Sequence, residues 1–259
     1  MTIPRVLIIA GSDSGGGAGI QADIKTVVML GGHPMTAITA ITAQNTLGVQ
    51  AVMPVPADTV LAQIDSVVAD LGVDAVKIGM IGSAGVAEAV AERLRCLEAP
   101  IVFDPVMVAS SGSPLADPGT VAAFGRLMKL ATLVTPNLLE LAALGGEAVV
   151  RATGAAVLVK GGHGEGETVE DRLVDAAGRQ TVWRNPRIDT PHTHGTGCTL
   201  ASGIATGLAA GLPLVESVGR AIDFVRAALA HAPGLGAGHG PMGHALGRVP
   251  FEDSLKCPD

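Results

Sequence analysis

Short runs of apolar residues alternate along the chain with longer stretches whose apolar positions recur at helical spacing. The short runs are β-branched or wholly apolar, which is typical of strands buried on both faces of a parallel sheet. They predict strands at Val6–Ala10, Thr36–Ala43, Ala75–Ile78, Ile101–Phe103, Leu133–Thr135 and Ala156–Val159. The helical spacing predicts helices at Ile20–Leu30, Asp58–Leu71, Ser83–Arg95, Asp117–Leu130, Leu138–Leu144, Thr196–Ala210 and Leu214–His231.

The alternation of strands and helices predicts an α/β fold, with one layered domain over residues 1–259 and right-handed crossovers. Two short apolar runs within Arg172–Asn185 flank a polar, glycine-containing turn and predict a β-hairpin. The glycine-rich segment Pro233–His244 is predicted to be a loop.

Composition narrows the class of protein. The formal net charge is −7 and only 2% of the residues are aromatic, so neither a basic surface nor a base-stacking platform for nucleic acid is expected. No apolar run approaches the ~18–20 residues of a membrane span. The 3 cysteines are scattered, which favours a reducing compartment over a disulfide framework. We therefore expect a cytoplasmic protein that binds neither nucleic acid nor membrane.

Polar or glycine-rich residues follow each of the six predicted strands. In open α/β sheets, ligands bind outside the carboxyl ends of the strands, so these segments should converge on one site. Strand ends are polar loops in any protein, but six such segments together favour a ligand site. The segments begin at Gly11, Gln44, Gly79, Asp104, Asn137 and Lys160.

Two glycine-rich segments are candidates for binding an anion. The first, Gly11–Gly19, matches neither a P-loop nor a dinucleotide-binding fingerprint, and a tight turn explains it almost as well. The second, Gly195-Thr196-Gly197, opens a predicted helix, whose N-terminus suits a phosphate or a developing negative charge. Cys198 follows in the first turn, where we expect the pKa of its thiol to fall, although a lone cysteine is more often buried and inert.

Several polar side chains at the strand ends carry further candidate chemistry. Asp104 and Glu140 suit Mg²⁺ held through waters, or else a helix cap and a solvated first-turn residue. Lys160 can reach a phosphate or form a surface ion pair. The amide of Gln44 offers a donor and an acceptor to a heteroaromatic edge, and Asp23 either does likewise or only caps and solvates a helix.

Taken together, these motifs resemble the hydroxymethylpyrimidine/phosphomethylpyrimidine kinases of thiamine biosynthesis, within the ribokinase-like superfamily. The matches run in order from near the N-terminus to about residue 210, with one more in the tail. No single segment is specific to this family, but the whole set in this order is. The matching segments are Ala10–Asp23, Thr42–Thr46, Lys77–Met80, Asp104–Met107, Thr135–Glu140, Lys160–His163, Thr193–Cys198 and Gly238–Pro241.

The resemblance implies a layered α/β/α domain with a mostly parallel central sheet and a small hairpin flap. It also implies transfer of a phosphoryl group from ATP to 4-amino-5-hydroxymethyl-2-methylpyrimidine, and then to the monophosphate, in a protein that is a homodimer. By position, it assigns an anion hole to Gly195, Thr196 and Gly197, activation of the hydroxymethyl group to Cys198, Mg²⁺ to Asp104 and Glu140, the nucleotide phosphates to Asn137 and Lys160, and the pyrimidine pocket to Gly11, Asp23, Gln44, Met80 and Val108.

Two other functions remain open from the sequence. A kinase of the same group that phosphorylates pyridoxal would use the same chemistry on a different ring, and Gln44 and Met80 favour the pyrimidine. A non-catalytic protein that binds the pyrimidine and reports on it would need no catalytic set. The presence of Asp104, Lys160 and Cys198 together weighs against that sensor.

Overall fold

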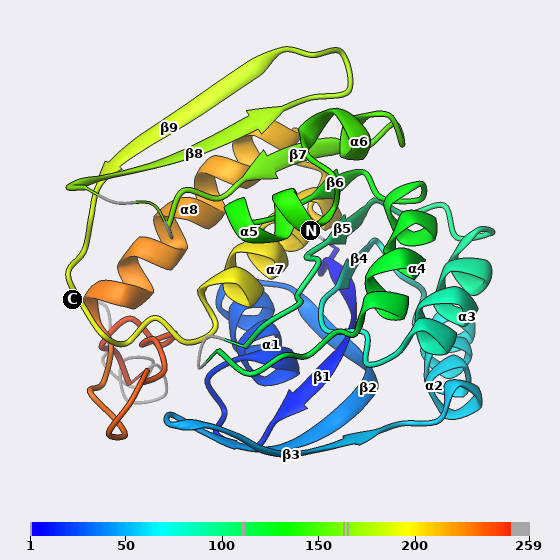
Figure 1. Ribbon diagram of the computed structural model, residues 1–259, viewed down its shortest axis with the longest axis horizontal. Coiled ribbons are helices and arrows are strands. Elements are labelled where there is room, and N and C mark those ends of the chain that lie inside the picture. The colour runs from blue at the N-terminus through cyan, green and yellow to red at the C-terminus, as the bar shows by residue number, and fades with distance from the viewer. Residues whose placement is uncertain (1, 110–111, 163, 165, 250–259) are drawn as a thin grey trace.

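A nine-stranded sheet forms the centre of the molecule in the computed structural model, which describes residues 2–109, 112–162, 164 and 166–249. The strand order is β3-β2-β1-β4-β5-β6-β7-β8-β9 (Figure 1). The six central strands are parallel, and β3, β8 and β9 are added antiparallel at the two edges. The strands are β1 Arg5–Asp13, β2 His33–Asn45, β3 Gly48–Pro54, β4 Ala75–Ile78, β5 Ile101–Phe103, β6 Leu133–Val134, β7 Ala156–Val159, β8 Thr168–Val174 and β9 Gln180–Pro186.

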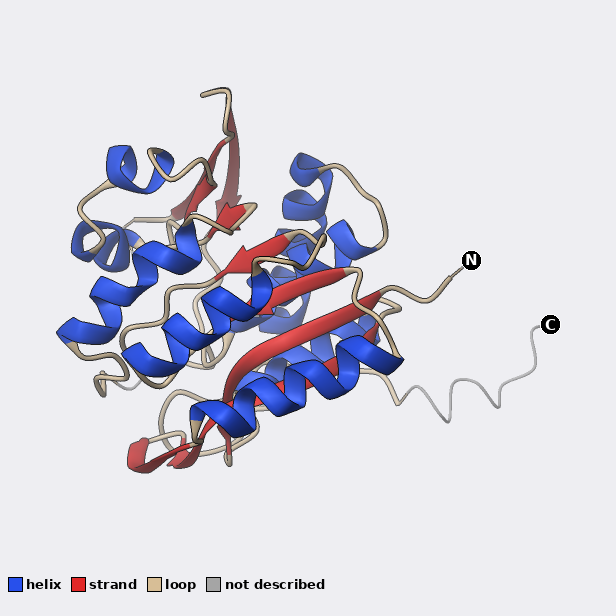
Figure 2. Cartoon of the chain, turned by 90° about the vertical axis from the view of Figure 1, so that its right-hand side faces the viewer, coloured by secondary structure: helices blue, strands red, loops and turns tan. Residues whose placement is uncertain are grey.

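Within the described ranges, eight helices cover both faces of the sheet (Figure 2). The first six lie between strands, and the last two follow β9. Their bounds are α1 Gly19–Met29, α2 Ala57–Asp70, α3 Ala84–Leu94, α4 Pro118–Met128, α5 Leu138–Ala143, α6 Glu147–Arg151, α7 Thr196–Ala209 and α8 Leu214–Ala230. None of the helices within the described ranges is long and apolar enough to cross a bilayer.

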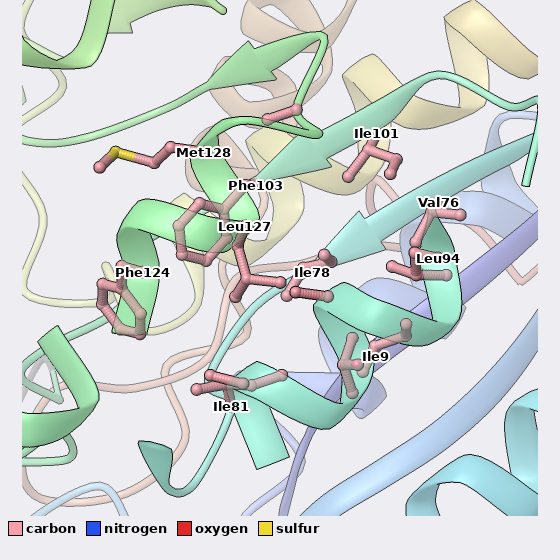
Figure 3. Close-up of a cluster of buried hydrophobic side chains, with 14 of the residues drawn as sticks. Ile9, Val76, Ile78, Ile81, Leu94, Ile101, Phe103, Phe124, Leu127 and Met128 are labelled. Carbon is pink, nitrogen blue, oxygen red and sulfur yellow. The ribbon is translucent and has the colours of Figure 1, made fainter. Parts of the chain in front are cut away.

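Side chains alternate between the two faces of the sheet because successive residues of a strand point to opposite sides. In β1, Leu7 and Ile9 pack toward α2, α3 and α4, whereas Val6 and Ile8 pack toward α1, α7 and α8. Figure 3 shows the first of these cores, where Phe103 and Phe124 meet edge to face with their ring centroids 5.2 Å apart. The two cores explain why most residues of the central strands are apolar on both faces, Lys77 on β4 being an exception.

The predicted helix starts at Ser83 and Asp117 coincide with the caps of α3 and α4. The Ser83 hydroxyl accepts a hydrogen bond from the backbone N–H of Val86, and the Asp117 carboxylate accepts one from that of Thr120. Each side chain satisfies a backbone donor that the first helical turn leaves free. These local signals explain why both helix starts were correctly predicted.

The predicted fold class is confirmed, with two differences at the sheet edges. β2 runs longer than the predicted Thr36–Ala43, and β3, which was not predicted, pairs with it antiparallel. Most of β3 is exposed although it contains the apolar residues Ala51, Val52 and Met53, so only its pairing with β2 identifies it as a strand. The predicted hairpin is confirmed and consists of β8 and β9. It begins at Thr168 rather than at Arg172. The short helix α6 was also not predicted.

Candidate active site

A cavity of about 760 Å³ lies at the carboxyl ends of the parallel strands. Residues that follow β1, β4, β5 and β7 contribute to its lining, together with the end of β2 and the first turn of α7. The sequence analysis expected these segments to converge, and the structure brings them together. Of the predicted site residues, the lining includes Gly11, Gln44, Met80, Asp104, Val108, Asn137, Glu140, Lys160, Gly195, Thr196, Gly197 and Cys198.

Asp23 is the predicted site residue that does not line the cavity. Its side chain is fully buried beneath it, where Oδ2 lies 2.8 Å from Lys77 Nζ and Oδ1 accepts a hydrogen bond of 2.7 Å from the Ser202 hydroxyl. The structure therefore corrects the expectation of a direct contact with the ring. The sequence placed Asp23 on the first helix, but only the packing of α1 against the sheet shows which way it faces.

The two glycine-rich segments pack against each other at the cavity. Gly195 precedes α7 with a φ of +87°, a left-handed conformation that favours glycine. A Cβ at Gly195 would collide with the carbonyl oxygen of Gly17, and a Cβ at Gly17 would collide with the ring of His194. No side chain caps α7, and the backbone N–H of Thr196 donates to the carbonyl oxygen of Thr193 over 3.3 Å. Among the described residues of this first turn, the N–H groups of Gly197 and Cys198 are therefore the ones left for a ligand.

Asp13 and His194 hold these two segments together, and the sequence analysis assigned neither a role in the site. His194 Nε2 donates to Asp13 Oδ2 over 2.9 Å, and the backbone N–H groups of Gly15, Gly17 and Ala18 donate to the same carboxylate at 2.8–3.0 Å. Burial disfavours the charge, but these hydrogen bonds outweigh it and hold the pKa of Asp13 below its usual value. The position of Asp13 at the end of a strand, before a run of glycines, was the available signal.

One side of the cavity, lined by Gly11, Gln44 and Met80 and called the acceptor side below, combines a polar amide with apolar groups. The hydroxyl of Thr42 donates to Gln44 Oε1 over 3.1 Å, and Gln44 Nε2 lies 3.2 Å from His194 Nε2. Met80 is buried against Gly11, where a Cβ would collide with its terminal methyl group. This side can therefore hold a flat ring and offer one fixed polar group to its edge.

A cluster of charged side chains lies on the other side of the cavity. Lys160 Nζ lies 2.7 Å from Asp104 Oδ1 and 3.7 Å from Glu140 Oε2, and the Thr135 hydroxyl donates to Asp104 over 3.0 Å. Burial opposes the charge on Lys160, but the two carboxylates outweigh it and raise the pKa of the amine. A Cβ at Gly197 would lie 3.3 Å from both Asp104 and Lys160, so the start of α7 lies directly against this cluster.

Glu140 also belongs to the cap of α5, whose N-cap residue is Asn137. The Asn137 side chain accepts from the backbone N–H of Glu140, and the Glu140 carboxylate accepts from that of Asn137, each over 2.8 Å. The helix-cap alternative from the sequence is thus present in the structure, but at Glu140 and Asn137 rather than at Asp104. Burial is the main cause that raises the pKa of Glu140, with Lys160 opposing it.

The prediction for the thiol of Cys198 is wrong in sign. Burial raises the pKa of Cys198 to about 11, and the positive charge of Lys77 only partly opposes this. A helix N-terminus lowers a thiol pKa where water or a cation supports the thiolate, but desolvation is the larger effect here. At neutral pH Cys198 is therefore mostly protonated in the resting protein.

Comparison with known proteins identifies the family. A family model described as phosphomethylpyrimidine kinase matches residues 13–243. A hydroxymethylpyrimidine/phosphomethylpyrimidine kinase from Streptomyces coelicolor is 48% identical over 264 residues, covering 95% of this chain and 97% of that protein. The chain belongs to the phosphomethylpyrimidine kinase family. It is a kinase, and the resemblance found in its motifs is confirmed.

Solved structures similar to this chain come from two kinds of vitamin kinase. A pyridoxal kinase from Staphylococcus aureus in complex with ADP superimposes with a TM-score of 0.87 at 31% identity, covering 96% of each chain. A phosphomethylpyrimidine kinase from Clostridium difficile 630 has a TM-score of 0.73 at 36% identity, covering 87% of this chain and 98% of that one. The ribokinase-like α/β fold is therefore confirmed, and a nucleotide is bound in one of these related structures.

Proposed function

We propose that this member of the family transfers the γ-phosphoryl group of ATP to 4-amino-5-hydroxymethyl-2-methylpyrimidine, and in a second reaction to the monophosphate, in thiamine biosynthesis. The observation that carries the proposal is the single cavity that joins a ring-sized acceptor side to a charged phosphate side. The first turn of α7, with Cys198, lies between the two. Relatives named for both activities support the assignment.

The acceptor side suits the pyrimidine through a small number of groups. Gln44 offers its amide to the polar edge of the ring, whereas Gly11 and Met80 provide close backbone approach and an apolar surface. Val108 also lines the cavity and is 52% exposed, so it is proposed to cover the ring from the solvent side. Asp23 lies buried below this pocket and does not line it.

The charged side suits the phosphates of ATP and one Mg²⁺ ion. Mg²⁺ is commonly held by one or two carboxylates together with substrate phosphates and waters. Asp104 and Glu140 supply two buried carboxylates beside Lys160, and no cluster of three potential protein ligands occurs in the described part of the chain. The donor set fits an ion shared with the substrate, which would neutralise charge on the phosphates. Asn137 and Lys160 are proposed to contact the nucleotide phosphates.

The proposed reaction is an in-line displacement at the γ-phosphorus. A bond forms from the hydroxymethyl oxygen to phosphorus, while the bond from phosphorus to the bridging oxygen of ADP breaks. The backbone N–H groups at Gly195 and Gly197 stabilise the charge of the transferred group, whereas that of Thr196 already donates to the carbonyl oxygen of Thr193. Cys198 orients the acceptor through its sulfur, and the proton of the hydroxyl passes to its thiolate, which is the minor form of Cys198 at neutral pH.

The proposal is tested by ³¹P NMR of ATP-dependent transfer with Mg²⁺. Hydroxymethylpyrimidine, its monophosphate and pyridoxal are offered separately to the wild-type protein and to Cys198→Ala. We expect product from both pyrimidines, slower transfer to pyridoxal by at least tenfold, and a loss of about a hundredfold or more in the variant. No transfer to any acceptor by folded protein would contradict the kinase assignment to these substrates and favour a sensor.

Pyridoxal is the second candidate acceptor. The observation that favours it is the close superposition with pyridoxal kinases, whose TM-scores reach 0.87. Sequence identity points the other way, since 48% identity is found with a hydroxymethylpyrimidine/phosphomethylpyrimidine kinase and 31% with a pyridoxal kinase. Pyridoxal phosphate as the main product of the NMR experiment would reverse this choice while leaving the reaction chemistry in place.

We further propose that the chain acts as one kinase domain, as a homodimer in the cytoplasm. The nine strands of a single sheet support one domain, whereas the homodimer and the cytoplasm follow from the family resemblance and the composition. Light scattering on the purified protein measures the oligomeric state directly. A monomer at the concentration used for turnover would contradict the dimer.

A further inference from the structure

Lys77 and Asp23 form a fully buried ion pair beneath the cavity, and the proposed reaction uses neither of them. Lys77 lies on β4 and Asp23 on α1, and each side chain has 0% exposure. Neither residue lines the cavity. Burying two charges costs several kcal/mol even when they are paired, and apolar residues of similar volume would join a strand to a helix equally well. The location of the pair therefore needs a reason other than stability.

The pair is connected to the helix that carries Cys198. Asp23 accepts a hydrogen bond from Ser202 over 2.7 Å, and Ser202 lies four residues after Cys198, one turn along the same face of α7. One turn before Asp23, the backbone N–H of Gly19 lies near Cys198 and favours its thiolate. Helices α1 and α7 therefore adjoin at two successive turns, and the deeper turn is held by the Asp23–Ser202 hydrogen bond, whose carboxylate also pairs with Lys77.

The ammonium group of Lys77 lies toward the cavity end of β4. A Cβ placed at Gly79, just past the end of that strand, would lie 2.6 Å from Lys77 Nζ. Burial opposes the charge on Lys77, but nearby negative groups outweigh it and raise the pKa of the amine above its usual value. Lys77 is therefore a permanent positive charge at the floor of the site.

Four charged groups act on the thiol of Cys198 from the surrounding elements. Lys77 and Lys160 favour the thiolate, whereas Asp23 and Asp104 disfavour it. Of these groups, Lys77 has the strongest influence on the thiol. Lys77 lies on β4, which packs against α7, and unlike Lys160 it forms no ion pair with the carboxylates assigned to Mg²⁺.

We propose that Lys77 and Asp23 are positioning residues for Cys198. Asp23 fixes the first turns of α7 through Ser202, and Lys77 supplies the fixed positive charge that makes the thiolate attainable. This inference rests on the proposed function in one respect, namely that Cys198 acts on the acceptor hydroxyl. Its test is therefore built on the chemistry of the thiol, which can be measured without turnover.

The principal variant is the double substitution Lys77→Met with Asp23→Asn. It removes both charges, because Lys77→Met alone would leave a buried carboxylate unpaired, and asparagine keeps an oxygen for Ser202. The matched control is Arg5→Met with Asp74→Asn. That pair, with 2.6 Å between its charged atoms, joins the start of β1 to the residue before β4, at the opposite end of the same strands.

The measurement is the rate of alkylation by iodoacetamide between pH 7 and 9, resolved by peptide mass spectrometry. Cys96 is exposed and serves as a reference within the same molecule. We expect the ratio of the Cys198 rate to the Cys96 rate to fall at least threefold in the Lys77/Asp23 variant, because the loss of the Lys77 charge outweighs the loss of the opposing Asp23 charge. The ratio should stay unchanged in the Arg5/Asp74 variant. The kcat should fall with the Cys198 rate, while the KM for ATP changes less than twofold.

A folded Lys77/Asp23 variant with a wild-type alkylation ratio would overturn the inference and leave the pair a structural one. If that variant does not fold, Ser202→Ala keeps both charges and breaks only the tie to α7. It should lower the alkylation ratio at least threefold, and an unchanged ratio would again overturn the inference. A wild-type protein without kinase turnover, but with the expected alkylation ratios, would contradict the proposed function and not the role of this pair.

Discussion

Helices α5 and α7 both begin at the cavity, yet their first turns are built in opposite ways. In α5, the side chains of Asn137 and Glu140 cap the backbone reciprocally. In α7, the preceding residue is Gly195, which has no side chain and lies in the left-handed conformation. One helix start is closed by its own residues and the other is left open to a ligand.

The difference shows two ways of placing a functional group at a helix start. In α5, the residues that stabilise the helix also face the cavity, so Glu140 serves as a cap and is proposed to serve as a metal ligand. In α7, the backbone itself is the proposed binding group, and a capping side chain would occupy the position that an anion needs. The stability of α7 comes instead from burial of its next turns, where nine consecutive residues from Thr199 to Gly207 are buried.

Of the substitutions that test this contrast, Gly195→Ala should reduce activity the most. Alanine is unfavourable at a φ of +87°, and its Cβ would collide with the carbonyl oxygen of Gly17, so the loop before α7 must move. We expect kcat/KM to fall by about a thousandfold, the upper range for loss of an anion-hole donor. Gly125→Ala, in open space on α4, is the control and should keep wild-type activity. Near-normal turnover in folded Gly195→Ala would remove the anion hole from the proposed mechanism.

Asp104→Asn should have the next largest effect. The substitution keeps the shape of the side chain but removes a buried negative charge that faces Lys160 and is proposed to hold Mg²⁺. We expect kcat/KM to fall about a hundredfold, with a higher Mg²⁺ concentration needed for half-maximal rate. Asp117→Asn, which neutralises a helix cap on α4, is the matched control. An unchanged Mg²⁺ requirement in Asp104→Asn would exclude Asp104 as a metal ligand.

His244 lies in the segment after α8 and contacts α7 through the side chain of Thr199. The His244 ring is buried, its Nε2 lies 2.9 Å from the Thr199 hydroxyl, and burial lowers its pKa to about 4. The unfolded chain, with an ordinary pKa of about 6.5, takes up a proton as pH falls from 6.5 to 4, while the folded protein does not. Stability is therefore full above pH 6.5 and lost on acidification, by about 2 kcal/mol at pH 5.

Denaturant unfolding at pH 7 and pH 5 measures this effect. His244→Gln removes the titrating group, so its loss of stability between the two pH values should be smaller than that of the wild type by about 2 kcal/mol. His33→Gln changes an exposed histidine and should behave as the wild type does. The same pH difference in His244→Gln and in the wild type would show that His244 does not limit stability in acid.

Glu140→Gln and Glu140→Ala separate the two roles at α5 and should have the smallest effects. Glutamine keeps an oxygen for the backbone N–H of Asn137, so thermal stability should be retained while kcat/KM falls about tenfold with the lost charge. Alanine loses the charge and the cap together, and should cost about 1 kcal/mol of stability in addition. Equal activity in Glu140→Gln and the wild type would leave Glu140 with the cap alone.

Much of the fold was predictable because its signals are local. The apolar runs of β1, β4, β5 and β7 identified the buried strands, and the caps at Ser83 and Asp117 marked helix starts. Strand β3 contains Ala51, Val52 and Met53 and was still missed, because only its pairing with β2 identifies this short exposed segment as a strand. The candidate site was predictable in outline because the strand ends meet at one edge of the sheet, and twelve of the thirteen site residues line the cavity.

The sequence by itself determined the order of elements, the family and the edge of the sheet where the candidate site lies. Only the tertiary structure decided which neighbours each buried ionisable side chain meets and how they shift its pKa. Asp23 faces down to Lys77 rather than into the cavity, and Cys198 has a raised pKa rather than a lowered one. The physical reason is that desolvation and Coulomb interactions depend on neighbours from other elements. Those neighbours, β4 and α1 around Cys198, are far from it in sequence and meet only when the sheet and its helices assemble.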